Sequence, residues 1–278
     1  LQRIMSVVQP VFSSSYLGFG LATGLERDIL ELLLLLSSNE MNTIPKLVLV
    51  GHSTGCQVLL KCITSSAWRS LPCEARNRVH SIVLQGPVSD RESFLGDAHM
   101  RQMISWACPT SPQTEGNGVF HLSDTPEKSQ LCPLGYFCGA AINAGRLRSL
   151  LCRLGEEDLF STDLSEKEVA SQLKLDLCKC VAGNNGQFAC LDNHEITGAR
   201  DSVAKIADDS FNLAIVLSGN DQYVPDRHQY AKFFDKTFSP VLQRCFPACA
   251  VSTHVIPEAD HACSNACEAI TSLILSVC

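Results

Sequence analysis

A serine flanked by glycines follows an apolar run in the segment Gly51-His52-Ser53-Thr54-Gly55. The preceding residues Lys46–Val50 are rich in Leu and Val, which is typical of a buried parallel strand. The following residues Cys56–Cys62 have the apolar spacing of a helix that is buried on one side. Glycines permit a tight turn that exposes the serine hydroxyl above the sheet. The pattern therefore predicts a nucleophilic Ser53, with a purely structural Gly-Ser turn as the alternative.

A serine hydroxyl needs a base to accept its proton as it attacks. Two later loops supply candidates: Asp221 follows the apolar run Phe211–Ser218, and His261 follows Val251–Ile256. Because the carboxyl ends of parallel strands meet at one edge of a sheet, we expect these side chains to converge with the serine. The chain order Ser, Asp, His then predicts His261 as the base and Asp221 as the acid that orients it.

Each of these residues has a structural alternative. Asp221 can be a turn residue before a proline, and His261 a polar residue at a helix start. Asp90, which also follows a predicted strand, is the second candidate for the acid. Asp260 and Glu258 lie too close to His261 in sequence to orient it easily. The histidines without such a context are expected to be surface or structural residues: His80, His99, His121, His194, His228 and His254.

The elements that must position these residues alternate between strands and helices, which predicts a parallel sheet covered on both faces. Strands are predicted at Ile4–Phe12, Lys46–Val50, Ser81–Gln85, Phe211–Ser218 and Val251–Ile256. A capping box at Thr23-Gly24-Leu25-Glu26 predicts a helix that runs through Leu36. Further helices are predicted after Ser53, over Arg227–Phe238, and from about Cys263 to the end.

Between these runs, residues from about 92 to 205 hold scattered glycines, prolines and cysteines with no convincing buried strand. We interpret this segment as a lid-like insertion over the sheet edge rather than an independent domain. Residues 1–278 are therefore predicted to form a single α/β domain. Within the insertion, Ala182–Gln187 is predicted to be a flexible loop.

Composition excludes several classes of partner. The net charge is -7 without a basic cluster, and aromatic residues make up only 6%, so nucleic acid and anionic membranes are not expected partners. The longest apolar block, around Leu32–Leu36, is too short to span a bilayer. No secretory signal is visible, and we expect a cytoplasmic protein. We predict no cofactor and a small-molecule ester or acyl substrate.

The chain contains 15 cysteines without regular spacing, which indicates reduced, mostly buried thiols; a disulfide framework is the alternative. Cys245, Cys249, Cys263 and Cys267 form two Cys-x3-Cys pairs with His261 between them, and four thiols can bind zinc tetrahedrally. The second pair has helical spacing among small residues. We therefore interpret these cysteines as apolar fillers, with a zinc-dependent module as a third hypothesis for the protein.

With these residues placed, the chain resembles a family of poorly characterised α/β-hydrolase-like proteins of fungi, plants and protists. Some fungal members are associated with hydrolysis of siderophore esters. The resemblance spans the chain, is weakest between about 95 and 140 and from 176 to 205, and rests on Ser14–Gly20, Gly51–Gln57, Leu84–Glu92, Asp158–Leu164 and Ser218–Pro225. It implies an α/β-hydrolase fold with a Ser53, Asp221, His261 triad, and it fixes no substrate.

One feature departs from that fold. The nucleophile usually follows five strands, whereas only two strand-like segments precede Ser53 here. The missing part includes the strand and loop that donate one of the two oxyanion-hole N–H groups, while Thr54 supplies the other. The loop Ser13–Gly20, through Tyr16, is a weaker candidate for lining the site, and a simple turn is preferred. The sequence thus predicts a serine hydrolase, with a non-catalytic small-molecule-binding protein on the same fold as the alternative.

Overall fold

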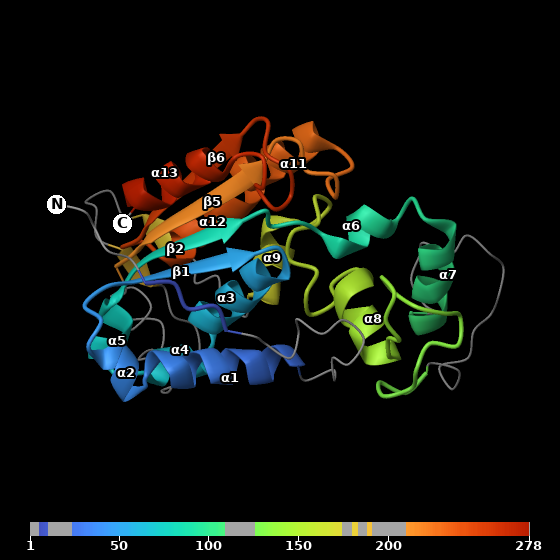
Figure 1. Ribbon diagram of the computed structural model, residues 1–278, viewed down its shortest axis with the longest axis horizontal. Coiled ribbons are helices and arrows are strands. Elements are labelled where there is room, and N and C mark those ends of the chain that lie inside the picture. The colour runs from blue at the N-terminus through green and yellow to red at the C-terminus, as the bar shows by residue number, and fades with distance from the viewer. Residues whose placement is uncertain are drawn as a thin grey trace.

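Within residues 6–10, 24–108, 126–173, 180–182, 188–190 and 210–277, which the computed structural model describes, the main sheet is parallel and has the order β1-β2-β5-β6 (Figure 1). Its strands are β1 (Leu47–His52), β2 (Val79–Gln85), β5 (Asn212–Ser218) and β6 (Ala250–Ile256). Four of the five predicted strands are therefore present, and their parallel pairing brings their carboxyl ends to one edge.

The two central strands are buried on both faces, which explains their continuous apolar sequences. Successive side chains of a strand point to opposite faces. In β2, Ile82 and Leu84 accordingly join the main hydrophobic core, whereas Val83 joins a smaller cluster on the other face. Leu213 and Ala214 of β5 divide in the same way.

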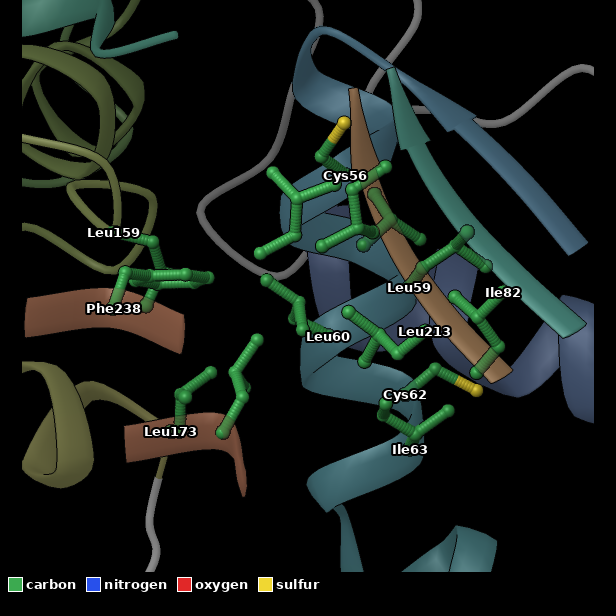
Figure 2. Packing of buried hydrophobic residues seen from close by; sticks show 14 of the residues in the cluster. Cys56, Leu59, Leu60, Cys62, Ile63, Ile82, Leu159, Leu173, Leu213 and Phe238 are labelled. Carbon is green, nitrogen blue, oxygen red and sulfur yellow. The ribbon is translucent and has the colours of Figure 1, made fainter. Parts of the chain in front are cut away.

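Helices near the N-terminus cover the face of the sheet that carries the main hydrophobic core. The helix α3 (Thr54–Thr64) follows β1 and packs between the sheet and α1 (Gly24–Leu36). Leu59, Leu60 and Ile63 of α3 pack among Ile82 and Leu213 of the strands and more distant core residues (Figure 2). The short helices that complete this region are α2 (Asn39–Asn42), α4 (Ser66–Ser70) and α5 (Cys73–Asn77).

Later helices cover both faces. A continuous helical stretch consists of α11 (Arg227–Phe233), the π-helical turn η3 (Phe234–Phe238) and α12 (Ser239–Cys245), and its phenylalanines pack against Phe160 in the main core. On the opposite face α13 (Cys267–Val277) packs Ile270, Leu273 and Ile274 against the sheet (Figure 1). Among the described residues, no helix has both the length and the apolar character that a bilayer crossing requires.

The segment between β2 and β5 contains α6 (Asp90–Phe94), α7 (Ala98–Ala107), α8 (Ala144–Leu151) and α9 (Glu166–Gln172). Of these helices, α6, α7 and α8 project beyond the sheet edge, whereas α9 packs against the main core (Figure 1). The helices α7 and α8 pack together around a hydrophobic cluster of their own, which includes Met103, Phe137 and Leu147. The structure adds an antiparallel hairpin, β3 (Cys180–Ala182) with β4 (Phe188–Cys190), which the sequence did not predict.

Two boundaries differ from the sequence predictions. Residues 6–10, the described part of the strand predicted over Ile4–Phe12, are exposed and have no regular structure. An apolar run forms a strand only where a neighbour completes its hydrogen bonds, and none of the described strands pairs with these residues. The last helix begins at Cys267 rather than near Cys263, because Cys263 has a φ of 53°, outside the helical region. The Thr23 capping position, the loop Ser13–Gly20 and residues 183–187 lie outside the described residues.

The cysteines are only in part the reduced thiols that were predicted. Cys108, after α7, and Cys152, after α8, are joined in a disulfide, with their Cα atoms 6.6 Å apart. The pairing was not predictable because these helices come together only through the insertion's own core. Among the described residues the free cysteines include five that are buried: Cys56, Cys62, Cys132, Cys249 and Cys263.

A network of polar side chains joins the start of the insertion to a segment between α8 and α9, and so closes the part that holds α7 and α8; we call this network, formed by residues 89–92 and 158–163, the clasp. Arg91 is only 2% exposed, and its Nε donates to Oδ2 of the equally buried Asp158 at 3.2 Å. The Arg91 guanidinium also pairs with Asp163. Ser89 and Ser161 share a hydrogen bond of 2.6 Å.

The clasp continues on the neighbouring residues. Glu92 Oε1 accepts hydrogen bonds from Thr162 N at 2.7 Å and from Thr162 Oγ1 at 2.9 Å. The two segments that form the clasp fall within Leu84–Glu92 and Asp158–Leu164. These segments contributed to the family resemblance, but no chemical role was evident for them in the sequence. In the structure both segments have the same role, which is to close the part of the insertion that holds α7 and α8 at its base.

We predict that Arg91→Ala lowers the free energy of unfolding by about 3–5 kcal/mol, because it leaves the buried Asp158 carboxylate without its counter-charge. Urea unfolding curves measure the change. Arg153→Ala is the matched control, since Arg153 also pairs with Asp163 but is 35% exposed, and we expect it to change stability by less than about 1 kcal/mol. Equal effects of the two substitutions would contradict a structural role for the clasp.

Candidate active site

Ser53 occupies the turn between β1 and α3 in a strained backbone conformation, with φ 54° and ψ -122°. Non-glycine residues rarely adopt this conformation, and it is found where a tight turn must present a side chain. Gly51 is required there, because a Cβ at this position would lie 2.5 Å from the carbonyl oxygen of Gly55. Gly55 itself has open space around it, so only the first of the two glycines is sterically necessary.

Hydrogen bonds fix the backbone around Ser53. Its N–H donates to the carbonyl oxygen of Gln85 at 3.1 Å, which ties the turn to the end of β2. Its carbonyl oxygen accepts from Cys56 N at 2.9 Å. Thr54 stands at the first position of α3, where a helix leaves its N–H groups without intrahelical partners and carries partial positive charge.

The structure brings the predicted acid and base together. His261 Nδ1 lies 2.8 Å from Asp221 Oδ2, and both residues are buried. The other carboxyl oxygen of Asp221 accepts from Tyr223 N at 2.9 Å, so the carboxylate is held at both oxygens. The His261 N–H donates to Gln222 Oε1 at 3.3 Å. The loop after β5 therefore fixes both the ring and the backbone of His261.

Gln85, the last residue of β2, connects the serine turn to the histidine loop. Its carbonyl oxygen accepts from Ser53 N, and its side-chain Nε2 donates to the carbonyl oxygen of His261 at 2.7 Å. The next residue, Gly86, has φ 57°, and a Cβ there would lie 3.0 Å from the His261 carbonyl oxygen and 3.3 Å from Nδ1. A larger residue than glycine at this position would displace His261.

Two rings that the sequence reasoning did not single out flank His261. The ring centroids of His52 and Tyr223 each lie 4.8 Å from that of His261. Desolvation and the neighbouring His261 lower the pKa of His52, even though part of its side chain reaches solvent. His52 had a usable signal in the sequence, since it directly precedes the serine in the same turn.

Within the described residues, no hydrogen bond joins the Ser53 hydroxyl to the His261 ring. Such contacts are often long without substrate and tighten when it binds. Asp90, the second candidate for the acid, makes no contact with His261 Nδ1, which is taken by Asp221. It lies in the first turn of α6, half-buried, at the same edge of the sheet.

The late cysteines are not arranged as a zinc site. Cys249 lies in the main core, whereas Cys263 lies in the cluster on the opposite face of the sheet. In the part of the chain that the structure describes, no group of His, Cys, Asp or Glu side chains is placed to hold a metal ion. The sheet between Cys249 and Cys263 separates the two pairs.

A parallel sheet covered on both faces, with the serine turn after β1, the acid loop after β5 and the histidine loop after β6, defines an α/β-hydrolase fold, as predicted. The solved structure of siderophore hydrolase EstB from Aspergillus fumigatus has this fold too, with a TM-score of 0.55 at 21% identity; the match covers 96% of this chain and 77% of that one. The chain belongs to the family described as protein of unknown function DUF1749, whose model matches residues 2–277.

Curated relatives are similar over part of their length. A UPF0613 protein of Schizosaccharomyces pombe is 31% identical over 175 residues, which cover 59% of this chain and 50% of the relative. An esterase of Emericella nidulans is 28% identical over 202 residues, which cover 59% of this chain and 53% of the relative. The chain thus spans about half the length of the curated relatives it matches.

The strained turn generates a stability prediction. We expect Ser53→Gly to be more stable than Ser53→Ala by about 1 kcal/mol, because glycine adopts a φ of 54° without the strain of about 1–3 kcal/mol that alanine retains. Thermal and urea unfolding of the two variants measure the difference. Ser272→Gly and Ser272→Ala provide the control, since Ser272 is exposed in the middle of α13, where glycine should be less stable than alanine by about 1 kcal/mol. A Ser53→Ala variant as stable as Ser53→Gly would show that the turn stores no strain.

Proposed function

We propose that this protein is a serine hydrolase that cleaves a carboxylic ester through an acyl-enzyme intermediate. Ser53 is the nucleophile, His261 the general base and Asp221 the acid that orients it. The observation that carries the proposal is the 2.8 Å contact between His261 Nδ1 and Asp221 Oδ2, at the sheet edge where the strained turn holds Ser53.

The geometry favours one of the two neutral tautomers of the His261 ring. The contact with Asp221 favours the imidazole tautomer that carries its proton on Nδ1, which leaves the Nε2 lone pair to accept the Ser53 proton. Ser53 Oγ then bonds to the carbonyl carbon. When the tetrahedral adduct collapses, the C–O bond to the alcohol breaks and His261 returns the proton to the departing oxygen. Water, deprotonated by His261, attacks the acyl group and releases the acid and Ser53.

Negative charge on the carbonyl oxygen needs hydrogen-bond donors. The Thr54 N–H, at the positive end of α3, is the donor we assign from this chain. A second donor would come from the part of the fold that precedes β1. Loss of one such donor typically costs about 10²–10³ in turnover. A low absolute rate is therefore compatible with an intact nucleophile.

Relatives give independent support for the reaction class. One curated relative is named an esterase, and the structure with the same fold is named a siderophore hydrolase. Because the match spans about half of the curated relatives and the structural likeness is at 21% identity, these names guide the choice of ester cleavage without fixing a substrate. We assign the segment from about 92 to 205 the role of covering the acyl or alcohol group.

A fluorophosphonate probe tests the proposal, because it reacts with an activated serine whatever the natural substrate. We expect one adduct by intact mass, lost in Ser53→Ala and His261→Ala. In Asp221→Asn the rate of labelling should fall by a large factor, since the asparagine no longer favours the productive tautomer; such a change in another triad lowered turnover about 10⁴-fold.

The control is Ser65→Ala, which removes a helix cap on α4 remote from the site and should leave labelling intact. Folded protein that stays unlabelled would contradict the proposal. Saturable binding of a small ester, retained in Ser53→Ala, would then favour a non-catalytic binding protein with this fold.

A further inference from the structure

Asp90 is held between two fixed neighbours at the edge of the site. Ser89 caps α6 by accepting from Glu92 N at 3.1 Å and bonds Ser161 in the clasp. Arg91 is buried against Asp158. The backbone on each side of Asp90 is therefore held by the clasp, which fixes where its side chain leaves the chain.

The Asp90 carboxyl itself is uncommitted. Among the described residues it makes no hydrogen bond and no ion pair. The charged groups that act on it come from several elements: Glu157 and Asp158 between α8 and α9, Arg146 on α8, and His261 after β6. Cys138, in the loop before α8, is also within its electrostatic reach. Asp90 thus lies between the histidine loop and the underside of the insertion.

Two side-chain oxygens without a hydrogen-bond donor lie in the same region as Asp90. Gln57 is on α3, one turn after Ser53, and its Nε2 donates to the carbonyl oxygen of Glu157 at 2.8 Å. Its Oε1 is buried and has no partner, and neither has Oε1 of the buried Glu157. The other Glu157 oxygen pairs with Arg146, so the positive charge of that arginine is matched locally. Arg91 and Asp158, the chain neighbours of Asp90 and Glu157, are in contact at 3.2 Å, which places the buried acceptors close to the Asp90 carboxyl.

These groups have an excess of acceptors and of negative charge. Buried acceptors without a donor make the surroundings of Asp90 more negative. A ligand that brings N–H donors and a positive charge to the accessible Asp90 carboxyl therefore gains from binding here. We propose that Asp90, supported by Glu157 and Gln57, forms a subsite that binds a primary ammonium group of the substrate. This inference rests on the proposed function and narrows it to esters that carry a protonated amine.

Burial, and then the negative charge of Glu157, raise the pKa of the Asp90 carboxyl to about 7, although part of the side chain remains accessible to solvent. Arg146 and His261 oppose this rise and Asp158 adds to it. Below that pH the carboxyl is protonated and neutral. A preference for ammonium substrates should therefore be strongest above pH 7 and decline as the pH falls through that value.

The test compares p-nitrophenyl β-alaninate with p-nitrophenyl butyrate, which differ in an ammonium against a methyl group. In the unmodified chain we expect a higher kcat/KM for the β-alaninate. In Asp90→Asn the ratio of the two kcat/KM values should fall about tenfold, the worth of one charge-assisted hydrogen bond. Glu156→Gln removes an exposed carboxyl from the same insertion and should leave the ratio unaltered.

Three results would overturn the subsite. The unmodified chain would show no preference for the β-alaninate, the ratio would survive Asp90→Asn, or both esters and fluorophosphonate labelling would fall by the same factor. The last result would mean that Asp90 acts through His261. If Asp90→Asn does not fold, the pH series on the unmodified chain decides, because the ratio must drop as the pH falls through about 7.

A failure of the proposed function is recognised separately, since the unmodified chain would then not react with the fluorophosphonate. Binding replaces turnover in that case. Ligand-observed NMR should show β-alaninamide bound more tightly than butyramide, and the difference should disappear in Asp90→Asn. Equal binding of the two amides by the unmodified chain would contradict the subsite independently of catalysis.

Discussion

The end of β2 is the constraint on which the site depends. Gln85 accepts from Ser53 N through its backbone and donates to the His261 carbonyl oxygen through its side chain, and its Nε2 also lies 3.2 Å from Cys263 Sγ. One residue thus sets the separation of the serine turn and the histidine loop. Because Gln85 is the last residue of a strand paired on both sides, its position is fixed by the whole sheet rather than by a local turn.

Much of this arrangement was predictable from local sequence. The strands β1, β2 and β5 contain apolar runs, β6 is rich in β-branched residues, and the alternation of these segments with helices implied a parallel sheet. Since each candidate residue lies in the turn or loop that follows a strand, topology alone placed Ser53, Asp221 and His261 at one edge. The contact between Asp221 and His261 then follows from adjacent strands with adjacent loops.

Contacts between segments that are distant in sequence could not be predicted. The clasp joins residues about 70 positions apart through single side chains, which leave no periodic signal. The Cys108–Cys152 disulfide depends on helices that meet only in the insertion's own core. His52 and Tyr223 flank His261 because of how three loops pack. At residues 6–10 an apolar run was mistaken for a strand because nothing in the local pattern reports whether a partner strand is present.

The clasp has a consequence for how this family can change. By holding residue 91 against residues 158 and 163, it brings the chain back to its point of departure, so residues 92–157 form a closed loop fastened at its base. The entropic cost of lengthening a closed loop is small, about 0.6 kcal/mol for each doubling. The length and composition of this closed loop can therefore change during evolution while the sheet edge keeps its geometry. The loop can change in this way without refolding the sheet edge that carries Ser53, Asp221 and His261.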